Sequence, residues 1–225
     1  MSIVLEPTIP VEVETRKNVF ISQSRTGTRQ TTIKSGVFRF YTLNFNVREL
    51  DEYLTKVTEY NTYYPNTAFE WTNADLGANG FHQFTSELKA TVQDPNTFSY
   101  SIEVRNRDGL IVTDPGSTTF SFKPNFAYDL TNTRKVLISE SIGMAHVGRS
   151  LNGVARQFQY SFQNRSLNEL LEAENFWAFH YPQNLITFAD DTFDESMSFW
   201  FDSNFKWTVK GVNLIDYTFV FTENI

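Results

Sequence analysis

The sequence predicts a mainly β protein made of two modules in tandem, each with one helix. Two observations carry this prediction. The stretch FTSELKATV at residues 84–92 recurs as FDSNFKWTV at residues 201–209, an offset of 201 − 84 = 117 residues. Aromatic residues make up 16% of the 225 residues, with 22 Phe and 10 Tyr, and many alternate with polar residues as they do in half-buried strands. We therefore expect two copies of an antiparallel sheet, each crossed by a helix.

The offset of 117 residues extends along most of the chain, and residues related by it are called counterparts below. The segment ISQS at 21–24 meets ISES at 138–141, and Tyr64-Pro65 meets Tyr181-Pro182. Further counterparts of matching type are Arg39/Arg156, Phe45/Phe162, Arg48/Arg165, Leu50/Leu167, Glu52/Glu169, Leu54/Leu171 and Tyr100/Tyr217. Solenoid repeats have periods of about 20 to 50 residues, so a period this long indicates a self-contained module in each copy.

Each copy changes its hydrophobic period in the same order. An alternating aromatic strand, at 38–45 and 158–162, precedes a helical pattern that begins at Leu50 and Leu167. Each helix should end near the Tyr-Pro pair, because proline disfavours a helical residue before it. Three strand segments then follow in each copy, a short one, a long one and a closing one. These are AFEW, FHQFTSELKATVQ and TFSYSIEV in the first copy, and LITF, MSFWFDSNFKWTVK and LIDYTFVF in the second.

In the long strands the apolar residues recur at the same places in both copies. These residues are Phe84, Leu88 and Val92, with the counterparts Phe201, Phe205 and Val209. They predict one buried sheet face that is kept in both modules. The turns DPN and GVN after the long strands have hairpin composition.

The repeat places the domain boundaries. The first module covers residues 1–106 with an extended N-terminal arm, residues 107–131 connect, and the second module covers residues 132–225. The connecting segment is long for a passive linker. Its stretch TTFSFKP alternates in polarity and predicts an extra strand or arm packed on one module.

Composition excludes several classes of function. Cysteine is absent, which excludes a disulfide framework, a thiolate metal site and a cysteine nucleophile. The formal net charge of −7 has the wrong sign for a protein that grips phosphate backbones, but it suits a wall along which DNA slides. No stretch approaches the roughly 18 apolar residues of a membrane span, and the first residues lack signal-peptide features. We expect a protein made in the cytoplasm, without membrane insertion.

The motif search for catalysis is negative. The histidines, His82, His146 and His180, have no partner at metal-ligand spacing, and we expect structural or surface roles for His82 and His180. The acidic cluster DDTFDE at 190–195 could supply oxygen ligands to calcium, but its spacing does not match an EF-hand, so we interpret it as a surface turn. The sequence therefore predicts no enzyme, no metal and no cofactor.

Four tryptophans allow an alternative function. They are Trp71, Trp177, Trp200 and Trp207. The periodicity places most aromatic side chains in cores or interfaces. The alternative is a tandem β-sandwich carbohydrate-binding protein that uses Trp200 or Trp207 to stack on host-surface sugars.

The order of elements in the second copy resembles a known family. A TRKV segment from Thr133, the helix RSLNELLEAENFW, the segment LITFADD and strands ending in YTFVFTEN are similar in order and pattern to the minor tail protein M family of lambda-type bacteriophages. The resemblance is clearest over 132–225, and the internal repeat extends it to 15–106. That family has one such module, whereas this chain has two. The resemblance implies two tandem tail-tube-like β-sandwich or barrel domains.

The resemblance also implies a function. The expected protein is a structural part of the phage virion, a distal tail or tail-tip (baseplate hub) ring that joins the hexameric tail tube to a trimeric tip. Its partners would be its own copies, as a homotrimeric pseudo-hexamer in preference to a hexamer, together with the tail tube protein, tail-tip or hub proteins and the tape measure protein. Phage DNA would pass through the lumen without specific binding.

The inter-subunit contacts are expected in the loops at 24–36 and 141–153 and on neighbouring strands. The candidate contact residues are Arg25, Arg29, Lys34, Arg48, Lys89, Arg149, Arg165 and Lys206.

Overall fold

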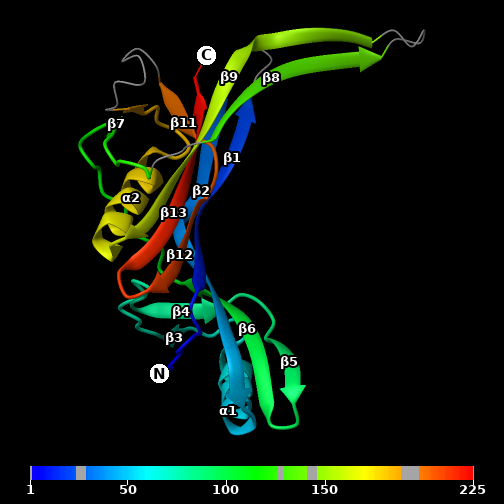
Figure 1. The fold of residues 1–225 in the computed structure, drawn as a ribbon, viewed down its shortest axis with the longest axis vertical. Coiled ribbons are helices and arrows are strands. Elements are labelled where there is room, and N and C mark those ends of the chain that lie inside the picture. The colour runs from blue at the N-terminus through cyan, green and yellow to red at the C-terminus, as the bar shows by residue number, and fades with distance from the viewer. Residues whose placement is uncertain (1, 24–28, 126–128, 141–145, 189–197, 225) are drawn as a thin grey trace.

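A computed structural model describes residues 2–23, 29–125, 129–140, 146–188 and 198–224. This described part of the chain is mainly β, with two helices of 14 residues each (Figure 1). The elements up to residue 106 are β1 (Val11–Gln23), β2 (Arg29–Glu49), α1 (Leu50–Tyr63), β3 (Phe69–Glu70), β4 (Phe81–Phe84), β5 (Lys89–Asp94) and β6 (Thr97–Asn106). The later elements are β7 (Thr119–Phe120), β8 (Asp129–Glu140), β9 (His146–Arg165), α2 (Leu167–His180), β10 (Thr187–Phe188), β11 (Phe199–Phe201), β12 (Phe205–Gly211) and β13 (Leu214–Glu223).

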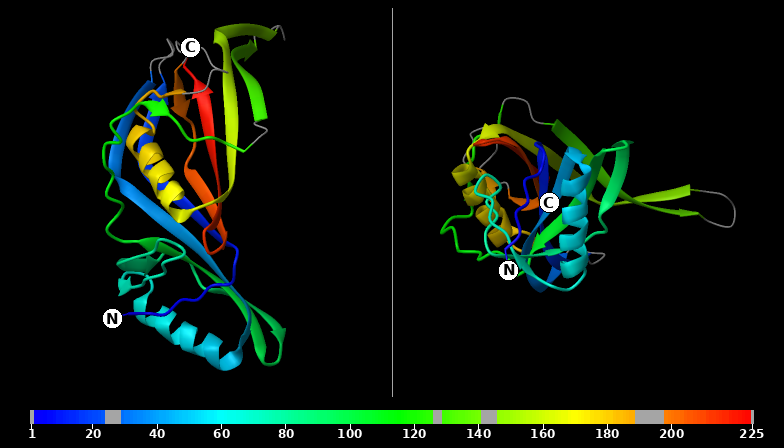
Figure 2. Two further views of the ribbon diagram at one scale, coloured as in Figure 1. Left: turned by 60° about the vertical axis from the view of Figure 1, so that its left-hand side comes forward. Right: turned by 90° about the horizontal axis from the view of Figure 1, so that it is seen from below.

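Eleven strands among the described residues form one open antiparallel sheet. Its order is β3-β4-β6-β2-β1-β12-β13-β9-β8, with β5 also paired to β6 and β11 to β13, while β10 and β7 form a separate parallel pair. Figure 1 shows α1 at one end of the sheet and the β8–β9 hairpin at the other, and Figure 2 shows this hairpin extending away from the rest of the molecule. No helix in the described part of the chain is long and apolar enough to cross a membrane.

The sheet continues across the predicted boundary between the two halves of the chain. We expected two sandwich or barrel modules, but β1 pairs with β12 from Val11↔Val209 to Thr15↔Phe205. Strand periodicity shows which face of a strand is buried but does not name the strand beside it. The sequence could therefore predict the strand β12 without predicting which strand lies beside it.

The helices lie where the hydrophobic period predicts them. Both end directly before a Tyr-Pro pair: the Tyr64 N–H donates to the Tyr60 carbonyl at 2.8 Å, and the Tyr181 N–H donates to the Trp177 carbonyl at 2.7 Å. At the start of α2 the Ser166 hydroxyl accepts a hydrogen bond from the backbone N–H of Glu169. The helices begin at residues 50 and 167, an offset of 167 − 50 = 117 residues.

Each predicted long strand is broken in two. In the first half β4 ends at Phe84 and β5 begins at Lys89, and β6 pairs with both pieces. The break lets the two pieces pair with different parts of one closing strand. The hydroxyl of Ser86, in the break, accepts a hydrogen bond from the Glu103 N–H of β6 at 2.9 Å. The second half has the same break between β11 and β12.

The predicted common sheet face is completely buried only in the second half. Phe201, Phe205 and Val209 are each 1% exposed, and Phe84 is buried. Val92, however, is 64% exposed, so the prediction was wrong for this residue. The difference arises because β12 lies beside β1, whereas β5 pairs only with β6 among the described strands.

The extra strand predicted in the connecting segment is β7, which pairs with β10 of the second half, whereas the Leu110 N–H of the same segment donates to the Val37 carbonyl of β2 at 2.7 Å. Phe120 on β7 is 2% exposed and lies among aromatic rings of the second half. The ring centroids nearest to it are 5.1 to 5.7 Å away and belong to Phe122, Phe176, Phe188, Phe219 and Phe221. A dense aromatic core therefore fixes this segment.

Several contacts of the first half recur at their counterparts. The rings of Phe45 and Tyr100 stack at 4.5 Å, and so do those of Phe162 and Tyr217. The N-terminal arm and the connecting segment form equivalent backbone hydrogen bonds to the sheet, although the sequence analysis did not identify them as counterparts. The Thr8 N–H donates to the Asn44 carbonyl at 2.6 Å, and their counterparts Asn125 and Ser161 repeat the bond at 3.0 Å.

Candidate functional site

The strands β1 and β2 meet α2 around one buried ion pair. The Arg39 guanidinium on β2 donates through Nε to the Glu174 carboxylate of α2 at 2.9 and 3.1 Å, and its Nη2 also donates to Glu174. The two side chains are 8% and 3% exposed. The Thr15 hydroxyl on β1 donates to the same carboxylate at 2.5 Å. The Glu174 carboxylate of the second half thus binds side chains on β1 and β2 of the first half.

The charges of this pair support each other. Burial lowers the pKa of the Arg39 guanidinium, but the adjacent Glu174 carboxylate more than offsets that effect and holds the pKa above its ordinary value. Arg39 also donates to the Gly77 carbonyl at 2.8 Å, and its backbone N–H donates to the Asn106 side chain at 2.7 Å. These bonds satisfy the buried groups that the pair brings into the core.

A lysine of β1 reaches the C-terminal end of α2. The Lys17 ammonium donates to the carbonyls of Ala178 at 2.8 Å and Tyr181 at 2.7 Å. Burial lowers the pKa of Lys17. A cation at this end of a helix complements the carbonyls that have no partner within the helix. The junction between the halves is therefore an edge-to-edge strand pair reinforced by α2.

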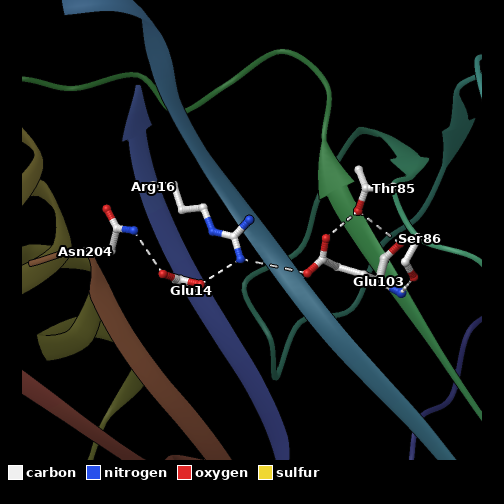
Figure 3. Close-up of polar contacts among 6 residues, drawn as sticks. All are labelled: Glu14, Arg16, Thr85, Ser86, Glu103 and Asn204. Carbon is white, nitrogen blue, oxygen red and sulfur yellow. Dashed lines mark hydrogen bonds and ion pairs between the residues drawn. The ribbon is translucent and has the colours of Figure 1, made fainter. Parts of the chain in front are cut away.

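The opposite face of the junction carries a polar network (Figure 3). The Arg16 guanidinium on β1 lies 2.7 Å from the Glu14 carboxylate and 3.9 Å from the Glu103 carboxylate of β6. The Asn204 amide, just before β12, donates to Glu14 at 3.0 Å. Burial raises the pKa of Glu14, but hydrogen bonds from Arg16 and Asn204 outweigh it and leave the pKa below its ordinary value. The network thus connects β1 to β6 and to the start of β12 across the junction.

The network ends at the break between β4 and β5. Here the Thr85 hydroxyl donates to the Glu103 carboxylate at 2.7 Å, beside the bond that the Ser86 hydroxyl accepts (Figure 3). Ser86 also donates to the carbonyl of the next residue at 3.3 Å, and its counterpart Ser203 does the same at 3.2 Å. Both serines therefore form hydrogen bonds that stabilise the backbone at the break.

This face of the sheet is polar and of mixed charge. Directly paired residues lie on one face of a sheet, and one row of them crosses from β6 to β13. Its members are Arg105, Phe40, Glu14, Lys206 and Thr218. Acidic and basic side chains alternate here, so the face does not form the basic patch that a phosphate clamp requires.

Two predicted contact residues, Arg48 and Arg165, make matching contacts within the chain. Arg48 donates to the Glu6 carbonyl at 2.9 Å and lies 3.5 Å from the Glu52 carboxylate. Arg165 donates to the Lys123 carbonyl at 2.8 Å and lies 3.3 Å from the Glu169 carboxylate. Each guanidinium also lies over the aromatic ring three residues before it. The recurrence of these arginines is explained by contacts that anchor each arm.

The other predicted contact residues are dispersed. Lys89 is exposed on β5, and Lys206 is exposed on β12 opposite Glu14. Arg29 and Lys34 lie on β2 and Arg149 lies on β9, while Arg25 falls outside the described residues. The structure does not gather these residues into one site, and their contacts with other subunits stay a prediction.

The buried histidines occupy aromatic positions. His82 and His180 are 0% and 1% exposed, and their counterparts are Phe199 and Tyr63. Burial lowers the pKa of both. Their positions favour the structural roles that the sequence predicts. His146 lies on β9, and the acidic cluster at 190–195 falls outside the described residues.

The described part of the chain was also compared with the requirements of metal binding and of sugar stacking. No group of three His, Asp or Glu side chains there could hold a metal ion. The tryptophans offer little for sugar stacking, because Trp71, Trp177 and Trp207 are at most 2% exposed. Trp200 is partly exposed, and its indole N–H donates to the Asn224 side chain at 3.2 Å.

Comparison of the sequence with known protein-family models and with curated proteins finds no match.

Sequence reasoning missed the junction and its ion pair. A signal was present, because Arg39 and its counterpart Arg156 match whereas Glu174 stands opposite Val57. An acid that appears in one copy only, on a helix face that should be buried, indicates a partner outside its own module. The identity of that partner required the tertiary structure.

Proposed function

We propose that this chain is a structural component of a bacteriophage tail, a distal tail or tail-tip (baseplate hub) ring protein. In this proposal the two halves are tube-like modules of one duplicated fold. Copies of the chain enclose a DNA-conducting channel and join the hexameric tail tube to a trimeric tip. The chain would belong to the virion and contact the tail tube, hub and tape measure proteins.

One observation carries the proposal: two halves with recurring contacts are joined edge to edge through β1 and β12. The arms, the stacked ring pairs and the anchoring arginines all recur at the 117-residue offset. A ring of like units requires each unit to offer one edge to the unit before it and another to the unit after it. The junction is a contact of this kind within one chain.

The polar sheet face supports the channel. It carries interspersed acidic and basic side chains together with Ser and Thr, and the chain as a whole has a net charge of −7. A wall of this composition does not clamp phosphates, and the Arg16 guanidinium lies over the ring of Phe40 on this face. DNA could then move past it without specific binding.

Electron microscopy of the purified chain, combined with native mass spectrometry, tests the proposal. The expected result is a homotrimer that forms a pseudo-six-fold ring with a central channel. A hexamer with two stacked rings would change the stoichiometry but keep the ring. A stable monomer at all concentrations, or an assembly without a channel, would refute the proposed function.

For the alternative of carbohydrate binding, only Trp200 of the two proposed tryptophans stays a candidate. Trp207 is 2% exposed and lies in the core, so it cannot stack on a sugar without unfolding its surroundings. Glycan-array binding that is lost on Trp200→Ala would favour this alternative over the tail proposal.

A further inference from the structure

The strands β5 and β12 are counterparts with opposite surroundings. On β12, Trp207 and Val209 are 2% and 1% exposed, because β1 lies beside them. On β5 all six residues are exposed, and Val92, the counterpart of Val209, is 64% exposed. Among the described strands β5 pairs only with β6. The strand β5 therefore presents an open edge and an exposed valine. Such an edge can pair with a strand of another chain.

The two helices differ in the same way. Seven residues of α2 are buried, but only Tyr63 is buried on α1. The cover of α2 includes β1 and β2, which contact it through Thr15, Lys17 and Arg39. Among the described elements, the strands that contact α1 most are β2, β4 and β6 of its own half. The first half thus lacks a neighbour that the second half has.

The chain also carries a strand of the type that is missing. The strand β8 is the counterpart of β1, and it lies at the end of the sheet, where it pairs only with β9 among the described strands. Figures 1 and 2 show the β8–β9 hairpin projecting from the molecule, whereas β1 and β2 lie within the sheet. Each molecule therefore offers both edges that the internal junction combines.

We propose that β8 of one copy pairs antiparallel with β5 of a second copy, in the register that β1 adopts with β12. The inference deepens the proposed function and rests on its duplicated modules. In the junction Glu14 pairs with Lys206. Their counterparts are residues 14 + 117 = 131 and 206 − 117 = 89, so Thr131 of one copy should pair with Lys89 of the next. Val92 then becomes buried as Val209 is.

The counterparts at this interface keep one contact of the junction and lose another. Lys17, which donates to the carbonyls at residues 178 and 181, corresponds to Arg134, so a cation is kept for the carbonyls of Asn61 and Tyr64. The acid Glu174 corresponds to Val57, so the buried ion pair is lost. A retained cation favours a second copy of this chain as the partner over an unrelated protein.

The contact is heterologous, because two different edges meet. A heterologous contact produces a closed ring when its rotation closes and an open filament when it does not. Three copies with two modules each would close a ring of six modules, as the proposed function requires. The strand pairing and the ring closure can therefore be tested separately.

Engineered cysteines test the pairing, because the chain has no cysteine of its own. The variant K89C/T131C should form disulfides between copies after mild oxidation, since paired residues on antiparallel strands lie within disulfide range. The variant E14C/K206C is the matched control and should link within one chain. The variant K89C/T133C, two residues out of register, should link far less.

Non-reducing gels and electron microscopy then distinguish the outcomes. Covalent species that stop at three chains would support both the pairing and the ring. A ladder of indefinite length would support the pairing and refute the closed ring. Rings that form while K89C/T131C stays unlinked and E14C/K206C links would overturn the pairing and leave the proposed function standing. A chain that stays monomeric would overturn both.

A charge on the exposed valine gives a second test that does not depend on oxidation. V92E should weaken self-association by about tenfold or more, because the carboxylate would be buried at the interface. Val212 is 68% exposed in the turn between β12 and β13, outside the proposed interface, and V212E should leave association unchanged. Both variants should fold, because both side chains are exposed. Equal association constants for the two variants would overturn the inference.

Discussion

Replacing Glu174 by glutamine tests whether the buried ion pair holds the two halves together. The carboxylate is 3% exposed and accepts from Arg39 and Thr15. The E174Q substitution would keep the shape of the side chain but leave the Arg39 charge buried without an opposite charge. Breaking a buried pair in this way costs about 3–5 kcal/mol. For a chain of this length that loss corresponds to a melting temperature roughly 10 °C lower.

A double-mutant cycle separates the pair from its surroundings. R39M alone should also destabilise the chain strongly, because it leaves the carboxylate buried and unpaired. R39M/E174Q removes both charges, and its loss in the free energy of unfolding should be smaller than the sum of the single losses by about 2–3 kcal/mol. Urea unfolding, followed by tryptophan fluorescence at concentrations where the chain is monomeric, measures each corner of the cycle.

The control is an exposed pair of the same chemistry. Arg48 and Glu52 are 26% and 40% exposed, and E52Q should change the free energy of unfolding by less than about 1 kcal/mol. If E174Q costs no more than E52Q, or if the cycle is additive, the pair does not couple the halves and our account of the junction is wrong.

Two further predictions follow from counterparts that differ. Val47 has a φ of +52°, at which a β-branched residue is strained. Its counterpart Asn164 has a φ of +54°, which asparagine adopts more readily. V47N should therefore raise the free energy of unfolding by about 1 kcal/mol in thermal melts and N164V should lower it, and a loss of stability in V47N would contradict this explanation. Burial lowers the pKa of His82 and His180, so the unfolded chain binds more protons than the folded chain as the pH falls below the unfolded value of about 6.5. Stability should fall between pH 7 and pH 5 by at most about 1.4 kcal/mol per pH unit for each histidine, and H82F/H180Y, which introduces the counterpart aromatic residues, should flatten this dependence in urea titrations at each pH. An unchanged slope in the double variant would show that other groups cause it.

The sequence by itself determined the features that depend on neighbouring residues. The helix α1 begins at Leu50, where the period changes, and ends before Tyr64-Pro65, and α2 repeats both limits. The alternation in the segment of β2 predicted one buried face, and Tyr41, Leu43 and Phe45 on that face are buried. These signals are readable because helix and strand periods are properties of a continuous stretch of chain.

Only the tertiary structure decided which strands meet. The segments of β5 and β12 are near-copies, yet Val92 is 64% exposed and Val209 is 1% exposed. Burial depends on what lies beside a strand, and β1 lies beside β12 but not beside β5. The same cause explains why the Arg39 and Glu174 ion pair could not be predicted, since 135 residues separate its members and their encounter follows from the strand pairing. Local periodicity specified the elements of each half, and the free edges of the sheets decided how the halves join.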